Sequence, residues 1–123
     1  MPTFDEISDM LAEITAAFPQ EFFENLNGGV ILVNRVVEHE KSKKPNDLYV
    51  LGRYFYEPNG LGRYIHIYYG SFIRVYGNLS LRRQKSELKR ILSHEFTHHL
   101  ESLAGERGLE RKDEAQMLEY LDD

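Results

Sequence analysis

The residues best suited to chemistry are the five from His94 to His98, which read His-Glu-Phe-Thr-His. They lie in a strongly helical run from about Ser80 to Ala104. Residues four apart stack on one face of a helix, so the imidazoles of His94 and His98 can point at one metal ion. Zinc takes such nitrogen ligands at about 2.0–2.1 Å. Glu95 can reach a metal-bound water without binding the metal, which makes it a candidate general base.

The helix that carries this motif has two distinct faces. One face is mostly apolar and holds Leu88, Leu92, Phe96, His99 and Leu103. The opposite face holds Glu87, His94, His98 and Glu101. A helix packed on the core through its leucines would present the histidine pair to a cleft. His99 shares the leucine face, so we expect a buried, hydrogen-bonded core residue there rather than a ligand.

Two histidines do not complete a catalytic zinc site, which usually has three protein ligands and an open position for water. Asp113 is the preferred third ligand, with Glu114 second and Glu101 third. Glu101 lies on the same helix as the histidines, and three ligands along one straight helix converge poorly on a tetrahedral centre. Gly105 and Gly108 permit a chain reversal that would bring Asp113 or Glu114 back. The same two acids could serve equally well as favourable charge at the start of a last helix.

Length and composition restrict the class of protein. The 123 residues suffice for a single domain, residues 1–123, with a real core. Twenty acidic against fifteen basic residues give a net charge of −5, which argues against a nucleic-acid partner. The chain has no cysteine, so a thiolate metal site is impossible. The first ten residues lack a secretory pattern and no apolar run is long enough to span a membrane, so we expect a cytoplasmic protein without a membrane partner.

Local patterns predict the elements that come before the motif. Thr3 to Glu6 fits a capping box, and apolar residues recur at helical spacing over about 4–17, followed by a short helical turn at 20–27. Strands are expected at 30–37, 49–56 and 63–69, and Pro58-Asn59-Gly60 joins the last two as a hairpin. The first strand is rich in β-branched residues and reads as buried on both faces. The polar stretch 39–47 reads as a loop in which His39 is solvated.

A short helix at 72–76, the long helix and a last helix at about 111–121 complete the pattern. Ser80 is the expected cap of the long helix, and Gly105 its expected end. Together these elements indicate an α+β fold, in which a small antiparallel or mixed sheet packs against the long helix.

An extended peptide would pair with a sheet edge beside the cleft, and strand 63–69 is the expected edge because it directly precedes the helical half of the chain. Tyr68, His66 and Arg74 are candidates for stabilising an oxyanion.

The sequence resembles the small bacterial zincin-like metallopeptidases, or minimal zincins, over most of its length. The likeness rests on Leu51-Gly52-Arg53-Tyr54, on the Ile-x-Ile-Tyr segment at 65–68, and on the doubled histidine, His98-His99, that ends the motif. It implies a compact α+β domain with a sheet beside the metal helix. It also implies a Zn²⁺ cofactor and hydrolysis of a peptide or unfolded protein substrate, with Glu95 as general base.

The sequence departs from that family directly after the motif. In similar proteins a Phe-Gly follows the doubled histidine almost at once, and an acidic residue comes shortly after the glycine. Here Leu100-Glu101 takes that place, and Gly108-Leu109 looks like the family's glycine displaced by an insertion. Asp113 then resembles the family's acid, which supports it as the third metal ligand.

Two alternative functions compete with a peptidase. A zinc-binding structural or regulatory module would close the fourth metal position with a protein ligand such as Glu101. A nucleic-acid-binding domain would use basic residues that crowd one helix segment or interleave with tyrosines. These residues are Arg53, Arg63, Arg74, Arg82, Arg83, Lys85, Lys89 and Arg90. The ordinary explanation of the basic residues is a solvated helix face.

Overall fold

Three α-helices and a three-stranded sheet form the part of the chain that the computed structural model describes, residues 1–43, 48–107 and 121. The elements follow in the order α1 (Phe4–Ala17), the 3₁₀ helix η1 (Gln20–Phe23), β1 (Gly29–Val33), β2 (Gly52–Glu57), β3 (Gly62–Tyr68), α2 (Tyr69–Tyr76) and α3 (Leu81–Arg107). The expected α+β class is confirmed, and the sheet is mixed. The last helix expected at about 111–121 lies outside the described residues except for Leu121.

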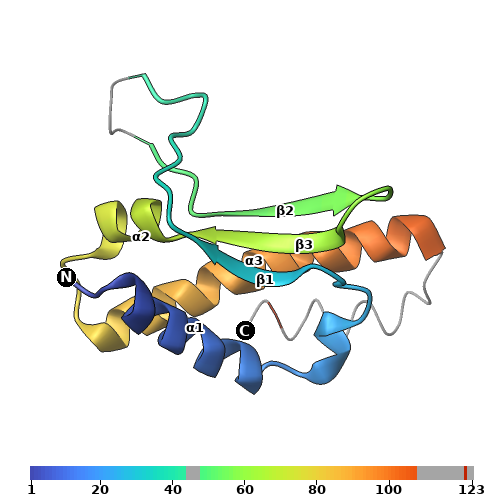
Figure 1. The fold of residues 1–123 in the computed structure, drawn as a ribbon, viewed down its shortest axis with the longest axis horizontal. Coiled ribbons are helices and arrows are strands. Elements are labelled where there is room, and N and C mark those ends of the chain that lie inside the picture. The colour runs from blue at the N-terminus through green and yellow to red at the C-terminus, as the bar shows by residue number, and fades with distance from the viewer. Residues whose placement is uncertain (44–47, 108–120, 122–123) are drawn as a thin grey trace.

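The sheet has the strand order β1-β3-β2, with β3 in the centre (Figure 1). β1 runs parallel to β3, and β2 runs antiparallel to it through the expected hairpin. The N–H of Gly60 closes the hairpin turn on the carbonyl of Glu57 at 3.0 Å. The expectation that strand 63–69 offers a free edge is wrong, because β3 is paired on both sides. The edge of the sheet on the side away from β1 is β2.

Burial of the strands also differs from the expectation. β1 is only partly buried, and Ile31 is exposed, because β1 is an edge strand. The strand buried on both faces is β3. Its Ile65 and Ile67 join the hydrophobic core, while Tyr64 and Tyr68 are buried on the other face of the sheet. Tyrosine can cover a sheet in this way because its ring is apolar and only its hydroxyl needs a polar partner.

α1 begins where its sequence indicates. The hydroxyl of Thr3 accepts the N–H of Glu6 at 3.2 Å, and the carboxylate of Glu6 accepts the N–H of Thr3 at 3.0 Å. This reciprocal pair satisfies two backbone donors that the first turn of a helix leaves unpaired. The buried face of α1 packs into one core with α3 and β3, so α1 and α3 cover the same face of the sheet (Figure 1).

α3 has the two faces that the sequence predicts. All five residues of the expected core face are buried, namely Leu88, Leu92, Phe96, His99 and Leu103. Ser80 caps the helix by accepting the N–H of Arg83 at 3.3 Å. The helix passes the expected end at Gly105 and continues to Arg107. Glycine permits a helix to end but does not force it to do so. In the part of the chain that the structure describes, no helix could cross a membrane.

Candidate active site

His94 and His98 converge on one point beside α3. They lie on consecutive turns of the helix with their ring centroids 4.7 Å apart, and their Nε2 atoms are separated by 3.2 Å. Two nitrogens bound to one tetrahedral zinc at about 2.0–2.1 Å would lie roughly 3.3–3.4 Å apart, so the pair fits a shared ion. Partial burial, followed by the neighbouring His98 and Arg90, lowers the pKa of His94. A lowered pKa favours the neutral imidazole that binds metal.

Glu101 contacts the His98 ring on the side away from His94. Its Oε1 lies 3.2 Å from Nδ1 of His98, on the nitrogen opposite the one that faces His94. A carboxylate accepts and does not donate, so Nδ1 carries a proton, and in the neutral ring Nε2 then has the lone pair that a metal requires. Such a carboxylate contact orients the ring of a metal-binding histidine and raises its basicity.

Glu95 points from α3 toward β2 and is only 5% exposed. Burial raises its pKa to about 7, while His98 and Arg53 oppose that rise. A carboxyl group with a pKa near 7 is divided between its two protonation states at neutral pH. This is the property that a general acid and base requires.

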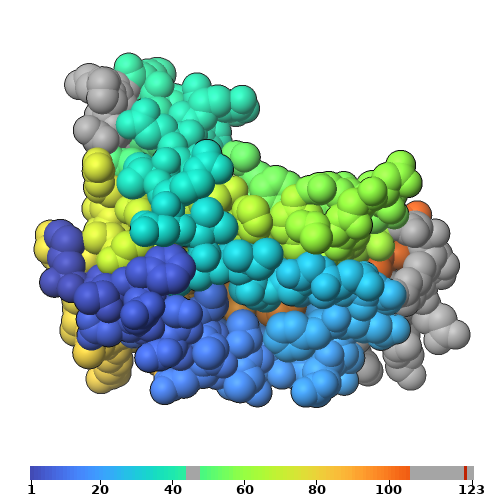
Figure 2. Space-filling model, in the orientation of Figure 1, coloured from blue at the N-terminus to red at the C-terminus, as the bar shows by residue number. Residues whose placement is uncertain are grey.

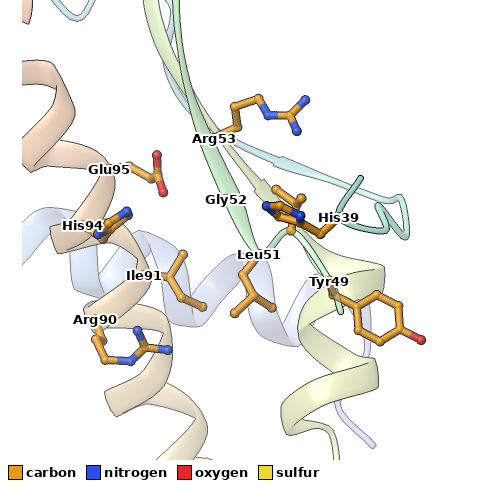
Figure 3. A pocket seen from close by; sticks show the side chains of 10 residues that line it. His39, Tyr49, Leu51, Gly52, Arg53, Arg90, Ile91, His94 and Glu95 are labelled. Carbon is orange, nitrogen blue, oxygen red and sulfur yellow. The ribbon is translucent and has the colours of Figure 1, made fainter. Parts of the chain in front are cut away.

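Two overlapping pockets open between α3 and β2, and Glu95 lines both. They share Gly52, Arg53, His94 and Glu95. The first, of about 380 Å³, extends toward Arg90, Ile91 and the segment Tyr49–Leu51, and it also includes His39 (Figure 3). The second, of about 450 Å³, extends toward His98 and Tyr54. His94 and the candidate base Glu95 therefore face the same space, and His98 faces its second part.

Gly52 lets the edge strand approach the motif helix closely. A Cβ atom at this position would lie 3.1 Å from Cγ2 of Ile91 on α3 and 3.2 Å from Cδ1 of Ile67 on β3. A larger residue would therefore push β2 away from α3. The absence of a side chain here helps to set the distance between β2 and Glu95.

From Gly52 onward, the outer edge of β2 pairs with no other strand in the part of the chain that the structure describes. Tyr68 donates its N–H to the carbonyl of Leu51 at 2.9 Å, and backbone groups alternate in direction along an antiparallel strand. The N–H and C=O groups of Gly52, Tyr54 and Tyr56 therefore point away from β3.

The chain itself occupies this edge before Gly52. The N–H of Val50 donates to Val37, and the N–H of His39 donates to Leu48, each at 2.8 Å. Beyond that point Figure 2 shows a hollow between the projecting segment around 36–43 and the hairpin tip. The position of a further strand is thus filled beside residues 48–50, and no described residue fills it beside Glu95.

The other histidines occupy different positions. His99 is fully buried, as expected, with Nδ1 2.9 Å from the hydroxyl of Tyr54 and Nε2 2.9 Å from the carbonyl of Glu24. His66 packs against aromatic rings on the sheet face away from α3. The oxyanion candidates His66, Tyr68 and Arg74 line neither pocket.

His39 is not a solvated loop residue as expected. It is partly buried and lines the first pocket together with His94 and Glu95. Its Nδ1 accepts the backbone N–H of Lys41 at 3.0 Å. Sequence reasoning missed His39 because its position depends on the pairing of the segment around Glu38 with Tyr49, and no local motif marks that bridge.

The third metal ligand cannot be placed from the described residues, among which no group of three His, Cys, Asp or Glu side chains could hold a metal ion. Asp113 and Glu114, the first two candidates, lie outside those residues. Glu101, the third candidate, contacts His98 on the nitrogen away from His94.

Several basic residues that suggested nucleic-acid binding have partners within the fold. Arg63 is buried, donates to Ser102 at 3.2 Å and lies 3.9 Å above the ring of Tyr56. Lys85 pairs with Glu13 at 2.9 Å and Arg90 with Glu87 at 2.8 Å. These contacts give the three side chains structural roles.

The fold and the site together define a small α+β domain with a His-Glu-x-x-His helix beside an open sheet edge. The chain is similar to a solved structure described as a conserved hypothetical protein from T. thermophilus, with a TM-score of 0.72 and 29% sequence identity. The match covers 84% of this chain and 98% of that one. No protein-family model matches the chain, and no curated protein matches it.

Proposed function

We propose that this protein is a zinc-dependent, zincin-like metallopeptidase in which His94 and His98 bind the metal, Asp113 is the third ligand and Glu95 is the general base. One observation carries the proposal: two imidazole Nε2 atoms lie 3.2 Å apart beside a buried carboxyl group, next to an open sheet edge. The resemblance to minimal zincins supports the same assignment. A neutral histidine pair suits zinc better than a hard cation such as Mg²⁺.

Each side chain has a defined role in this proposal. Zinc held by the histidine pair would supply a water of lowered pKa and polarise the scissile carbonyl. Glu95 accepts a proton in its ionised form and delivers it to the leaving amine in its protonated form. In the metal-free protein its pKa of about 7 makes both forms accessible at neutral pH. Glu101 keeps the ring of His98 in its orientation through Nδ1.

An extended peptide binds by adding a strand to the outer edge of β2. This edge replaces strand 63–69 in the proposal, because β3 is central in the sheet. The outward backbone groups of Gly52, Tyr54 and Tyr56 supply the hydrogen bonds. A peptide in this position runs past Glu95, since Gly52 and Glu95 line the same pockets.

The test is the metal content of the purified protein, measured by inductively coupled plasma mass spectrometry. We expect about one zinc per chain in the wild type and its loss in His98→Ala. Glu95→Gln should keep the zinc and hydrolyse no peptide, because the base is lost while the ligands remain. Zinc retained by His98→Ala, or unchanged turnover by Glu95→Gln, would contradict the proposal.

Three further variants separate the candidates for the third ligand by zinc affinity. Asp113→Asn should weaken zinc binding most, because it removes a ligand. Glu101→Gln should weaken it by about 10–100-fold, the usual effect of losing a residue that orients a ligand. Glu114→Gln is the matched control and should bind zinc like the wild type. A larger loss of zinc affinity in Glu114→Gln than in Asp113→Asn would identify Glu114 as the third ligand in place of Asp113.

A further inference from the structure

Arg53 is a cation at the mouth of the candidate site. It lines both pockets beside His94 and Glu95, and its side chain is exposed. Among the described residues it makes no hydrogen bond or ion pair, whereas Arg90, which lines the same wall, pairs with Glu87 at 2.8 Å. Within the described part of the chain, Arg53 therefore has no hydrogen-bonded or paired carboxylate to give up when an anion binds.

The pleat of β2 puts Arg53 on the opposite side of the strand from the catalytic candidates. Tyr54 turns toward α3 and reaches His99, so its neighbour Arg53 leaves from the other face, opposite His66 in the register. In Figure 3 the guanidinium lies across β2 from Glu95, on the same side as the ring of His39. The outer edge of β2 thus has Glu95 and the histidine pair on one side and Arg53 and His39 on the other.

His39 adds a fixed hydrogen-bond donor to this far side. Its backbone N–H donates to Leu48 at 2.8 Å, and its Nδ1 accepts the N–H of Lys41 at 3.0 Å. Because Nδ1 is an acceptor, the ring proton lies on Nε2. Among the described residues that line the first pocket, Glu95 is the sole acid, and Arg90 is already paired with Glu87. Arg53 is therefore the cation that remains to attract a negatively charged ligand on the side of β2 away from Glu95 (Figure 3), despite the net charge of −5 of the whole chain.

We propose that Arg53 and His39 form a subsite for a carboxylate, so that the protein acts on extended peptides with Asp or Glu close to the cleaved bond. This inference rests on the proposed function. Side chains alternate along a strand, so a peptide paired with β2 turns every second side chain away from α3, toward Arg53 and His39. The planar guanidinium of Arg53 matches both oxygens of a carboxylate, and Nε2 of His39 supplies another donor.

The test begins with a random peptide library, cleaved by the zinc-loaded wild type and sequenced at the new N-termini. Peptides that differ only by Glu, Gln or Lys at the selected position are then compared by kcat/KM. We expect Glu to be preferred over Gln by about tenfold, which is the effect of one charge-assisted pair. Arg53→Gln should abolish the preference, and Arg53→Glu should transfer it to the Lys peptide.

Matched controls separate this subsite from general electrostatics. Arg82→Gln removes the same charge from an exposed position on α3 that does not line the pocket, and it should keep the Glu preference. His39→Gln should reduce the preference without reversing it.

Amidated and free-acid versions of each peptide show whether the carboxylate belongs to a side chain or to the peptide C-terminus. A preference for Glu that is present only in the free-acid peptides overturns the side-chain assignment. Equal rates for Glu and Gln, or an unchanged preference in Arg53→Glu, overturn the subsite.

A binding measurement separates failure of the subsite from failure of the proposed function. Fluorescence anisotropy gives the affinity of Glu95→Gln for labelled Glu and Gln peptides at low and high salt. Tighter binding of the Glu peptide, lost at high salt and in the Glu95→Gln/Arg53→Gln double variant, supports the subsite. Equal binding of the two peptides overturns it. Absence of cleavage of every library peptide contradicts the peptidase instead.

Discussion

Glu95 carries its carboxyl group into a region where the charged form is poorly solvated. The residue is 5% exposed and makes no hydrogen bond to any described residue. Folding therefore reduces the contact of the carboxylate with water without giving it a described donor in exchange. The rise of its pKa to about 7 follows mainly from that burial. In the proposed function, a metal-bound water and the substrate would supply hydrogen bonds to Glu95, so the metal-free protein bears the full free-energy cost of burying its charged form.

This cost predicts a pH dependence of stability in the metal-free protein. Because the pKa of Glu95 is raised from 4.5 to about 7, the folded protein holds this proton more tightly than the unfolded chain does. The resulting contribution to the free energy of unfolding is complete below about pH 4.5 and is lost as pH rises through 7. The loss is on the order of 3 kcal/mol at alkaline pH. Glu95→Gln should not show it, and should be the more stable protein at about pH 8. Urea unfolding of both chelator-treated proteins at about pH 5 and pH 8 measures the difference.

Both proteins keep His94 and His98, so they differ only in the carboxyl group of Glu95. Parallel stability profiles for the wild type and Glu95→Gln would show that Glu95 is solvated in the folded protein.

His99 is a core residue that resembles a member of the motif. Both of its ring nitrogens are used: Nε2 donates to the carbonyl of Glu24, and Nδ1 accepts the hydroxyl of Tyr54, each at 2.9 Å. His99→Leu should destabilise the fold by about 2–4 kcal/mol, because it removes both hydrogen bonds of a fully buried ring. Tyr54→Phe should cost about 1 kcal/mol. Urea denaturation measures both, and loss of zinc from His99→Leu would instead indicate a role in the metal site.

At the scale of elements, local patterns predicted α1, the hairpin and the two faces of α3, and long-range pairing escaped them. The capping box and helical spacing act within a few residues, so α1 was predicted with its bounds. Nothing local shows that β1 pairs with β3 and makes it central. The unbroken apolar run of β1 suggested that β1 is a central strand. The central strand is β3, whose tyrosines gave no sign in the sequence that it is buried on both faces.

The candidate site follows the same division. His94, Glu95 and His98 were predictable because one helix fixes their spacing. Arg53 and His39 reach the pocket through sheet pairing and a bridge between distant segments, which spacing cannot predict. Gly52 was the one available signal, since a glycine inside a strand often marks the close approach of another element.

The closeness of β2 and α3 at Gly52 yields a prediction about these two elements. Gly52→Ala would put Cβ 3.1 Å from Cγ2 of Ile91, and the overpacking should cost about 1–3 kcal/mol. Leucine has no β-methyl, so Ile91→Leu should relieve the contact. The double variant should therefore be more stable than the sum of the single changes predicts, by roughly 0.5–3 kcal/mol in a double-mutant cycle from urea unfolding. Strict additivity would mean that β2 and α3 are not held together at this point.

At the scale of the whole molecule, the hydrophobic core does not depend on the candidate metal site. Buried residues from α1, η1, β3, α2 and α3 form one continuous cluster. His94 and His98 are exposed on the far side of α3 from this core. A chain of 123 residues is long enough to be stabilised by such a core without a metal. A structural zinc module differs in this respect, because its folding free energy comes largely from the ion.

If the protein binds zinc as proposed, removal of the ion should therefore leave the protein folded. After treatment with a chelator we expect an unchanged far-UV circular dichroism spectrum and cooperative unfolding. The melting temperature should be lower by roughly 15 °C, since zinc at a thousandfold excess over its Kd contributes about 4 kcal/mol. His98→Ala is the matched control and should melt at the same temperature with and without the chelator. A chain that unfolds on chelation would support the structural zinc module over the peptidase, because only a structural ion is needed to hold the elements together.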